Sequence, residues 1–311
     1  MNADGRTEVD VPVDVSVVVA SVESAHSIKS CLDSVRTAVA GMRSEVMVVD
    51  ASRDESAKLA EKELGVGHVV RCPPGTLTPE LWAAGIARST GRVVALTTGH
   101  FAVEATWLAS LTSALEGGEM GAAGRIDLAD ETAVTDWAVF YLRYSEFLRE
   151  PERIERGVSG IPADNAAYDG DAIRRFVTAT DDGFWEVEFH RQLHAAGGSL
   201  AMVSGATAQY RRSFPFLTIA GHRYQHGRHS GAWRVSRNIR SVPAVVMAFP
   251  LVPFALAART WRRVRSSAVH RSRFVRALPV FLALAFMLAV GEAVGALSGA
   301  PTSRRVAPVP V

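Results

Sequence analysis

The chain has 311 residues, which is enough for one large domain and an appendage. Its formal net charge of +2 hides an asymmetry: residues 1–203 carry 18 basic and 31 acidic side chains, whereas residues 204–311 carry 16 arginines and one acid, Glu292. No aromatic-interleaved basic face or zinc-ligand spacing accompanies this charge, so the basic, apolar tail argues against nucleic acid and favours an anionic membrane surface.

The first half of the chain has a β-α-β pattern. Residues 1–12 are polar and are expected to be disordered. Two Val-rich runs, 15–21 and 45–50, are typical of strands buried on both faces of a parallel sheet. The intervening residues 27–40 carry apolar side chains at helical spacing. The sequence therefore predicts an α/β fold with a mostly parallel central sheet flanked by helices.

Small and acidic residues follow these two strands. Ser21 and Glu23 end the first strand, and Asp50 and Asp54 follow the second. Ligands of such sheets bind beyond the carboxyl ends of the strands, so these side chains suit the base and ribose of a nucleotide. The alternative is local, because Asp is a good helix N-cap and a helix is expected from about residue 55.

The α/β body is predicted to continue to about residue 210. Helices are expected at 56–64, 78–89, 106–115, 171–176 and 184–195, and strands at 68–71, 91–97 and 200–203. Cys31 and Cys72 fit no CxxC spacing, so both are expected to be reduced thiols. The first 14 residues lack the basic and apolar regions of a signal peptide, so we expect the body to be cytoplasmic.

Two apolar segments lie in the tail. Segment 242–258 is broken by three prolines, whereas segment 277–297 is long enough to cross a hydrocarbon core of roughly 30 Å. The arginines between them favour a first segment in the interface and a second that crosses once. A two-helix hairpin and a buried helical pair are the alternatives. Glu292 should face a partner helix or lie near the membrane boundary, and Gly291, Gly295 and Gly299 have GxxxG spacing.

Several segments in a fixed order carry a family resemblance. They are 15–23, 48–54, 81–96 followed by Trp107-Leu108, 165–168 and 184–188. This order resembles the family 2 glycosyltransferases, which have a GT-A fold, over about residues 13–228. The resemblance implies a nucleotide-binding half at 13–123, an acceptor-side half at 124–228 and a basic, membrane-associated region at 229–311.

The resemblance also implies roles for individual residues. Asp50 would contact the base of a nucleotide-sugar donor, since a carboxylate can accept the imide N–H of uracil, with Ser21, Glu23, Asp54 and Thr98 in the same pocket. Glu186 falls at the family's catalytic base, with Glu188 as second candidate. On a helix these two glutamates point in different directions, so only one can face the site. Asn165 and Trp185 would lie on the acceptor side.

The sequence departs from the family at its metal motif. The family normally has Asp-x-Asp where this chain has Thr97-Thr98-Gly99-His100, with no carboxylate before Glu104. His100 could replace the carboxylates, which would suit Mn²⁺ better than Mg²⁺. Alternatively, Arg223 and Arg228 could neutralise the leaving diphosphate, or catalysis could be lost. We favour the arginines, and Mn²⁺ or Mg²⁺ as a cofactor stays an alternative.

These observations predict a membrane-associated, inverting glycosyltransferase at the cell membrane, with its catalytic domain in the cytoplasm. Its donor would be a nucleotide-diphosphate sugar, and its acceptor a lipid-linked or cell-envelope saccharide. The alternative is a catalytically inactive relative that binds nucleotide-sugar or a partner enzyme at the membrane. A more remote alternative is a nucleotidyltransferase, which would release pyrophosphate.

Overall fold

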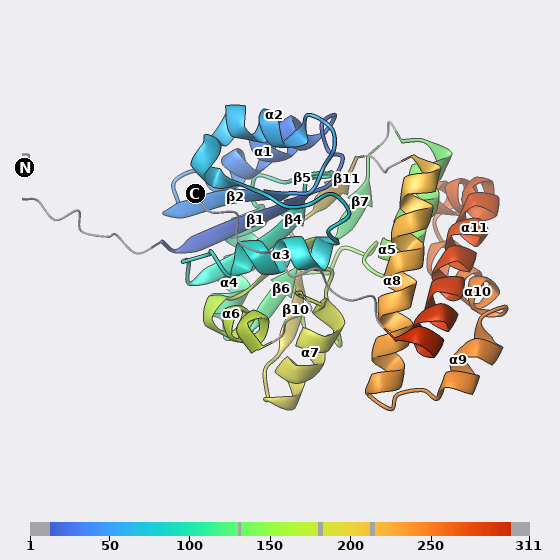
Figure 1. Ribbon diagram of the computed structural model, residues 1–311. Helices are drawn as coiled ribbons and strands as arrows, with labels where there is room; N and C mark the ends of the chain where they lie inside the picture. Colours follow the sequence, from blue (N-terminus) through green and yellow to red (C-terminus); the bar gives the residue numbers. More distant parts are fainter. Residues whose placement is uncertain (1–12, 130–131, 180–182, 212–214, 300–311) are drawn as a thin grey trace, which may run out of the picture.

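The computed structural model describes residues 13–129, 132–179, 183–211 and 215–299. The N-terminal segment that we expected to be disordered, 1–12, lies outside these residues. Figure 1 shows an α/β body on one side of the molecule and a group of C-terminal helices on the other, with α8 standing between them.

The body is built on an eight-stranded sheet of order β3-β2-β1-β4-β9-β6-β10-β8. Strand β1 pairs in parallel with both β2 and β4, whereas β9 is antiparallel to β4 and β6. The mixed α/β architecture with a large central sheet confirms the predicted fold class. The strands are β1 (Val15–Ser21), β2 (Ser44–Asp50), β3 (Val69–Arg71), β4 (Val93–Thr98), β6 (Gly121–Ala123), β8 (Ile154–Arg156), β9 (Asn165–Asp169) and β10 (Leu200–Val203).

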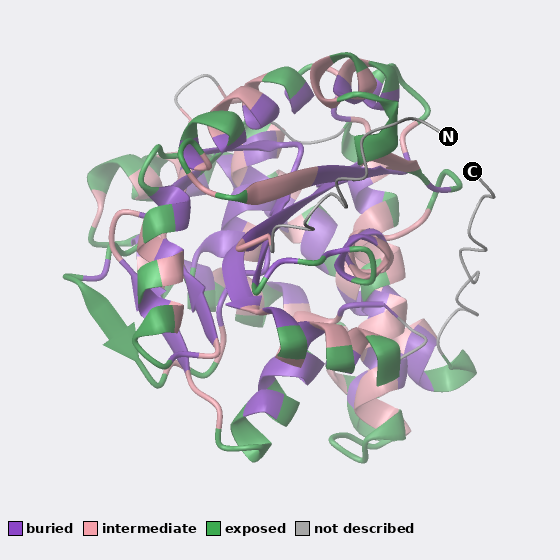
Figure 2. Cartoon of the chain, turned by 90° about the vertical axis from the view of Figure 1, so that its left-hand side faces the viewer, coloured by how far each residue is buried: buried purple, intermediate pink, exposed green. Residues whose placement is uncertain are grey.

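The Val-rich run of β1 is buried on both faces because each face has its own hydrophobic core. Val17 and Val19 belong to the core that includes Ile28 and Leu32 of α1, whereas Val18 lies in the second core with Leu81 of α3. Figure 2 shows the central strands as mostly buried. The body helices are α1 (Ile28–Ala38), α2 (Ser56–Leu64), α3 (Thr78–Ile86), α4 (Trp107–Glu116), α6 (Gly170–Ala179) and α7 (Glu186–Ala195), and a 3-10 turn covers Val66–His68.

Several short strands were not predicted as strands. A second sheet of order β5-β11-β7 contains β5 (Phe101–Val103), β7 (Ile126–Leu128) and β11 (Ala208–Tyr210). Each spans three residues, too few to show a strand periodicity. Both cysteines are free and buried, which agrees with the reduced thiol expected at Cys31.

The C-terminal helices pack against each other and against α5 (Val134–Tyr144). They are α8 (Phe216–Ser236), α9 (Val242–Ala248), α10 (Val252–Val264) and α11 (Ala268–Ser298). The boundary that we predicted after residue 228 falls within α8. The proline-broken segment forms α9 and α10, which meet at 69°. Helix α11 is long and apolar enough to cross a membrane, but half of its most apolar stretch is buried against other helices.

Helices α8 and α11 are in close contact along a glycine seam, formed by Gly227 and Gly231 of α8 and Gly291 and Gly295 of α11. A Cβ at Gly291 would lie 2.1 Å from the carbonyl oxygen of Tyr224, and one at Gly231 would lie 2.0 Å from that of Glu292. Only glycine therefore permits this approach. Gly299 lies beyond the seam, at the end of α11, and has a positive φ of 79°.

We expect Gly291→Ala to destabilise the protein, because the added methyl group must push α11 away from the backbone of α8. Overpacking of this kind costs about 1–3 kcal/mol, which thermal unfolding would detect as a lower Tm. Gly221→Ala is the control on the partner helix α8, since a Cβ there meets nothing within 4 Å. Its expected effect is neutral or stabilising by up to about 1 kcal/mol, from helix propensity. Equal losses at the two positions would contradict the seam.

Candidate active site

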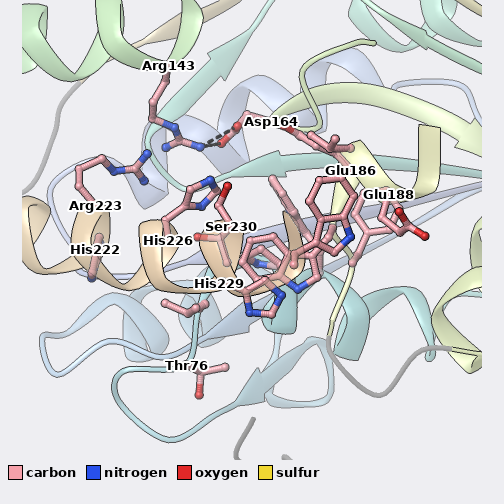
Figure 3. A pocket seen from close by; sticks show the side chains of 18 of the residues that line it. Thr76, Arg143, Asp164, Glu186, Glu188, His222, Arg223, His226, His229 and Ser230 are labelled. Atoms are coloured by element: carbon pink, nitrogen blue, oxygen red, sulfur yellow. Dashed lines mark hydrogen bonds and ion pairs between the residues drawn. The ribbon is translucent and has the colours of Figure 1, made fainter. Parts of the chain in front are cut away.

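A cavity of about 230 Å³ lies between the α/β body and one face of α8. The body contributes Val22 after β1, residues 76–79, Trp82 of α3, Arg143 of α5, Asp164, and residues 184–188 at the start of α7. Helix α8 contributes side chains three or four residues apart, which places them on one face. They are Ile219, His222, Arg223, His226, His229, Ser230, Trp233 and Arg234. Figure 3 shows how the labelled side chains converge.

Glu186 is the first residue of α7 and lines this cavity. Its Oε2 accepts a hydrogen bond of 2.9 Å from the backbone N–H of Ala163. Burial, and next the negative charge of Asp164, raise the pKa of Glu186 to about 7, because both disfavour the charged carboxylate. A carboxyl group of this pKa can accept a proton near neutral pH, which a general base requires.

Asp164 is held by Arg143. Arg143 Nη2 lies 2.9 Å from Oδ2 and 3.1 Å from Oδ1 of Asp164, which is 4% exposed. Figure 3 marks this pair with dashed lines. Burial opposes the charge of Arg143, but the carboxylate of Asp164 outweighs it and raises the pKa of Arg143 above its ordinary value. Arg143 thus holds the carboxylate of Asp164 in place, where its negative charge acts on Glu186. Because Asp164 is already paired, it is not a free base.

Glu188 has a different environment, although it also lines the cavity. Arg191 Nη2 lies 2.7 Å, and Arg237 Nη2 3.1 Å, from Oε1 of Glu188. Hydrogen bonding from Arg191 is the main reason that the pKa of Glu188 falls to about 2. The structure therefore distinguishes the two glutamates: Glu188 is a permanently charged partner of arginines, whereas Glu186 can exchange a proton.

Arg223 supplies a positive charge at the same end of the cavity as Arg143 and Asp164. Among the described residues its Nε has no hydrogen-bond partner, and no carboxylate of that set forms an ion pair with it. Burial, and next the charge of Arg143, lower the pKa of Arg223 to about 10, so it remains a cation at neutral pH. Burial lowers the pKa of His222 to about 4 and shifts that of His226 in the same direction, so these rings are neutral.

Comparison with known proteins identifies the family. Residues 16–214 match the model of Glycosyl transferase family 2. The chain belongs to this family. It is therefore a glycosyltransferase, as the resemblance implied. The match ends just before α8, so this helix, which forms one wall of the cavity, lies beyond the matched residues.

Solved structures with similar folds include two of S. aureus TarS. One, of TarS 1-349 in complex with UDP-GlcNAc, has 10% sequence identity and a TM-score of 0.47, over 87% of this chain and 90% of that chain. The other has 11% identity and a TM-score of 0.46, over 87% of this chain and 54% of that chain. No curated protein matches the glycosyltransferase described here.

The acids at the strand ends bind neighbouring loops of the glycosyltransferase body. Asp50 accepts hydrogen bonds from the N–H (3.0 Å) and Oγ (2.7 Å) of Ser52. Glu23 accepts one from the N–H of Arg53, and Asp54 accepts others from the N–H groups of Ala25 and Ser56. Asp54 thus makes the kind of local bond to the start of α2 that the capping alternative anticipates. The five residues predicted to bind the nucleotide, Ser21, Glu23, Asp50, Asp54 and Thr98, do not line the cavity, although Val22 does.

The position of the family's metal motif has no carboxylates and is closed. His100 is 5% exposed, and its Nε2 lies 2.9 Å from the carbonyl oxygen of Val22. A Cβ at Gly99 would lie 2.7 Å from Ser24 Oγ. The described part of the chain contains no group of three His, Cys, Asp or Glu residues arranged to hold a metal ion. These residues therefore do not fit a Mg²⁺ or Mn²⁺ site.

The remaining predicted residues separate into two groups. Trp185 lines the cavity, and its ring stacks on His229 with centroids 3.7 Å apart. Asn165 is fully buried: it accepts a hydrogen bond from Trp107 Nε1 and donates to the carbonyl oxygens of Arg125 and Ala206. Arg228 does not line the cavity, and its backbone packs against Gly295. Of the cavity face of α8, only Arg223 was predicted; the other residues of this face were missed, although the spacing of its His and Arg residues could have indicated them.

Proposed function

We propose that this glycosyltransferase transfers a sugar from a nucleotide-diphosphate sugar to a saccharide acceptor with inversion of the anomeric centre. The observation that supports this most directly is Glu186, a carboxyl group of pKa about 7 in the cavity. Its carboxylate would take the proton of an acceptor hydroxyl as that oxygen bonds to the anomeric carbon. The bond from this carbon to the diphosphate would break at the same time, and its electron pair would leave with the diphosphate.

The growing charge of the diphosphate would be neutralised by Arg223 instead of by a metal ion. Arg223 is a cation in the cavity without a carboxylate partner among the described residues. A preorganised guanidinium in a partly desolvated site stabilises a leaving anion strongly. Arg228, our second candidate for this role, faces α11, so Arg223 alone is the proposed contact.

We further propose that α9, α10 and α11 attach the protein to a membrane from the cytoplasmic side. Large exposed apolar side chains gather on this part of the chain: Met247, Leu251, Phe254, Trp261, Val269, Val275, Phe286 and Leu297. Exposed arginines accompany them: Arg262, Arg265, Arg271 and Arg276. Because one face of α11 already packs on α5 and α8, we favour a helix that lies along the membrane surface. Such attachment suits a lipid-linked or cell-envelope saccharide acceptor, and co-sedimentation with anionic lipid vesicles would test it.

The proposed activity can be tested with a panel of nucleotide-diphosphate sugars, measuring nucleoside diphosphate released by the purified protein. We expect turnover of at least one donor, changed less than about twofold by EDTA, because no step depends on a carboxylate-bound metal ion. Glu186→Gln is the control for contaminating hydrolases. Absence of turnover with every donor would refute the proposal, and release of pyrophosphate would replace it with nucleotidyl transfer. Loss of activity in EDTA with recovery on adding Mn²⁺ would refute its metal-independent part.

A further inference from the structure

The cavity has two chemically different ends. Arg223 and Arg234 both line it from α8, and they are eleven residues apart in the sequence. At 1.5 Å per helical residue, their Cα atoms are separated by about 16 Å along the helix axis. Arg223 lies in the field of Arg143 and Asp164. Arg234 is therefore far from the proposed position of the diphosphate. The end of the cavity that contains Arg234 must bind a different part of the substrates.

Arg234 is paired with an acid from the far end of the chain. Its Nη1 lies 2.8 Å from Oε1 of Glu292 on α11, and Ser230 Oγ donates to the same oxygen at 3.4 Å. The side chain of Glu292 is 8% exposed and that of Arg234 is 35% exposed. The buried carboxylate thus holds one edge of the guanidinium and cancels its charge, while the rest of the guanidinium remains accessible. The glycine seam fixes this geometry, because Gly231 contacts the backbone of Glu292.

Aromatic side chains line the cavity from the middle of α8 to this end. Trp185 and His229 form a stacked pair with an interplanar angle of 12°, and Trp233 precedes Arg234 on α8. Within the described residues, Trp233 Nε1 has no hydrogen-bond partner. Ring faces can pack on the apolar C–H faces of a sugar, while N–H donors can bind its hydroxyl groups. A charge-cancelled arginine next to Trp233 suits an uncharged saccharide better than an anion, because the carboxylate of Glu292 already neutralises its guanidinium.

We propose that Glu292 is a positioning residue, which holds Arg234 at this aromatic end so that the cavity binds an uncharged saccharide there. This inference rests on the proposed function, since it assigns this end to the acceptor of glycosyl transfer. It makes α11 part of the binding site, although none of its residues lines the cavity.

Saccharide binding can be measured by quenching of tryptophan fluorescence, without any donor. The probes are chitotriose and maltotriose as uncharged oligosaccharides and trigalacturonate as the anionic one, titrated into the full chain. We expect saturable quenching by at least one uncharged probe, and weaker or no quenching by trigalacturonate. Glu292→Gln and Arg234→Ala should each raise the Kd for that uncharged probe about tenfold, as expected for one lost hydrogen bond to a charged group.

The double variant separates positioning from general destabilisation. If Glu292 acts through Arg234, Glu292→Gln has no further effect in the Arg234→Ala background, and the Kd for the nucleoside diphosphate of the active donor is unchanged in each variant. The inference would be overturned if the increases in Kd caused by the two substitutions multiplied in the double variant. Tighter binding of trigalacturonate, or no binding of either uncharged probe, would also overturn it. Arg234→Ala leaves the helix seam untouched, so it stays informative if Glu292→Gln fails to fold. Failure of the proposed function would appear separately, as absence of donor turnover by the wild-type protein.

Discussion

Replacing Glu186 by glutamine is expected to reduce kcat by about 10²–10⁴-fold, the usual contribution of a general base. Glutamine keeps the size of the side chain and can still accept the hydrogen bond from Ala163, but it cannot take a proton from the acceptor. Donor affinity should therefore change little. Steady-state kinetics, and calorimetric titration with the nucleoside diphosphate of the active donor, would measure the two effects separately.

Glu188→Gln is the matched control, two residues along the same helix. Its carboxylate is committed to Arg191 and Arg237, so we expect a lower Tm and a much smaller fall in kcat. If the two variants lost kcat equally, Glu186 would have no special role. A larger loss at Glu188 would move the base to that residue.

The pH dependence offers an independent check on Glu186. The base is active when deprotonated, and its raised pKa places the acidic limb of the kcat/KM profile near pH 7, well above the ordinary range of a glutamate. Activity should fall as the pH decreases through this value. Asp164→Asn removes a negative charge that raises the pKa, so the limb should move to lower pH. If the acidic limb of this variant stayed at the wild-type pH, a group other than Glu186 would control it.

Arg223→Ala is expected to reduce kcat/KM for the donor by about 10²–10³-fold, because the leaving diphosphate loses its cationic contact. Added Mn²⁺ should not restore the rate, since the strand end at Thr97–His100 offers no carboxylate ligands. The assay is donor turnover at fixed acceptor, with and without Mn²⁺.

Arg228→Ala is the comparison for Arg223, because it removes the same charge from the same helix on the side away from the cavity. We expect a loss at least tenfold smaller than that of Arg223→Ala. Similar losses for the two variants would indicate a general effect of basic charge on α8. Recovery of the Arg223 variant by Mn²⁺ would instead support a metal-assisted reaction.

Some features of the fold could be predicted because their signals are local. The Val-rich runs of β1 and β2 and the helical spacing of α1 identify a parallel β-α-β unit without knowledge of the rest of the chain. The short strands β5, β7 and β11 could not be found in this way. They exist because distant segments pair with one another, as Phe101 does with Tyr210.

The site shows the same limit more clearly. The sequence identified Glu186 and Glu188 as candidates but could not rank them by chemistry. The pKa of Glu186 depends on its burial and on Asp164, and that of Glu188 depends on whether Arg191 and Arg237 contact it. The acids at the strand ends give a second example. Asp50 has the residue type that a nucleoside site needs, but the sequence could not show that its carboxylate also accepts hydrogen bonds from Ser52.

The glycine seam changes how the C-terminal region should be viewed. One face of α8 forms a wall of the cavity, and its glycines are locked to α11, which is the last described helix. A protein shortened after Ser236 would lose only Arg237 and Glu292 among the candidate site residues and their ion-pair partners, yet α8, which presents many of the others, would have lost its support. The C-terminal region therefore supports the cavity, whether or not it also attaches the protein to a membrane as proposed. During synthesis, the cavity can therefore reach its functional shape only after α11 has left the ribosome and packed against α8.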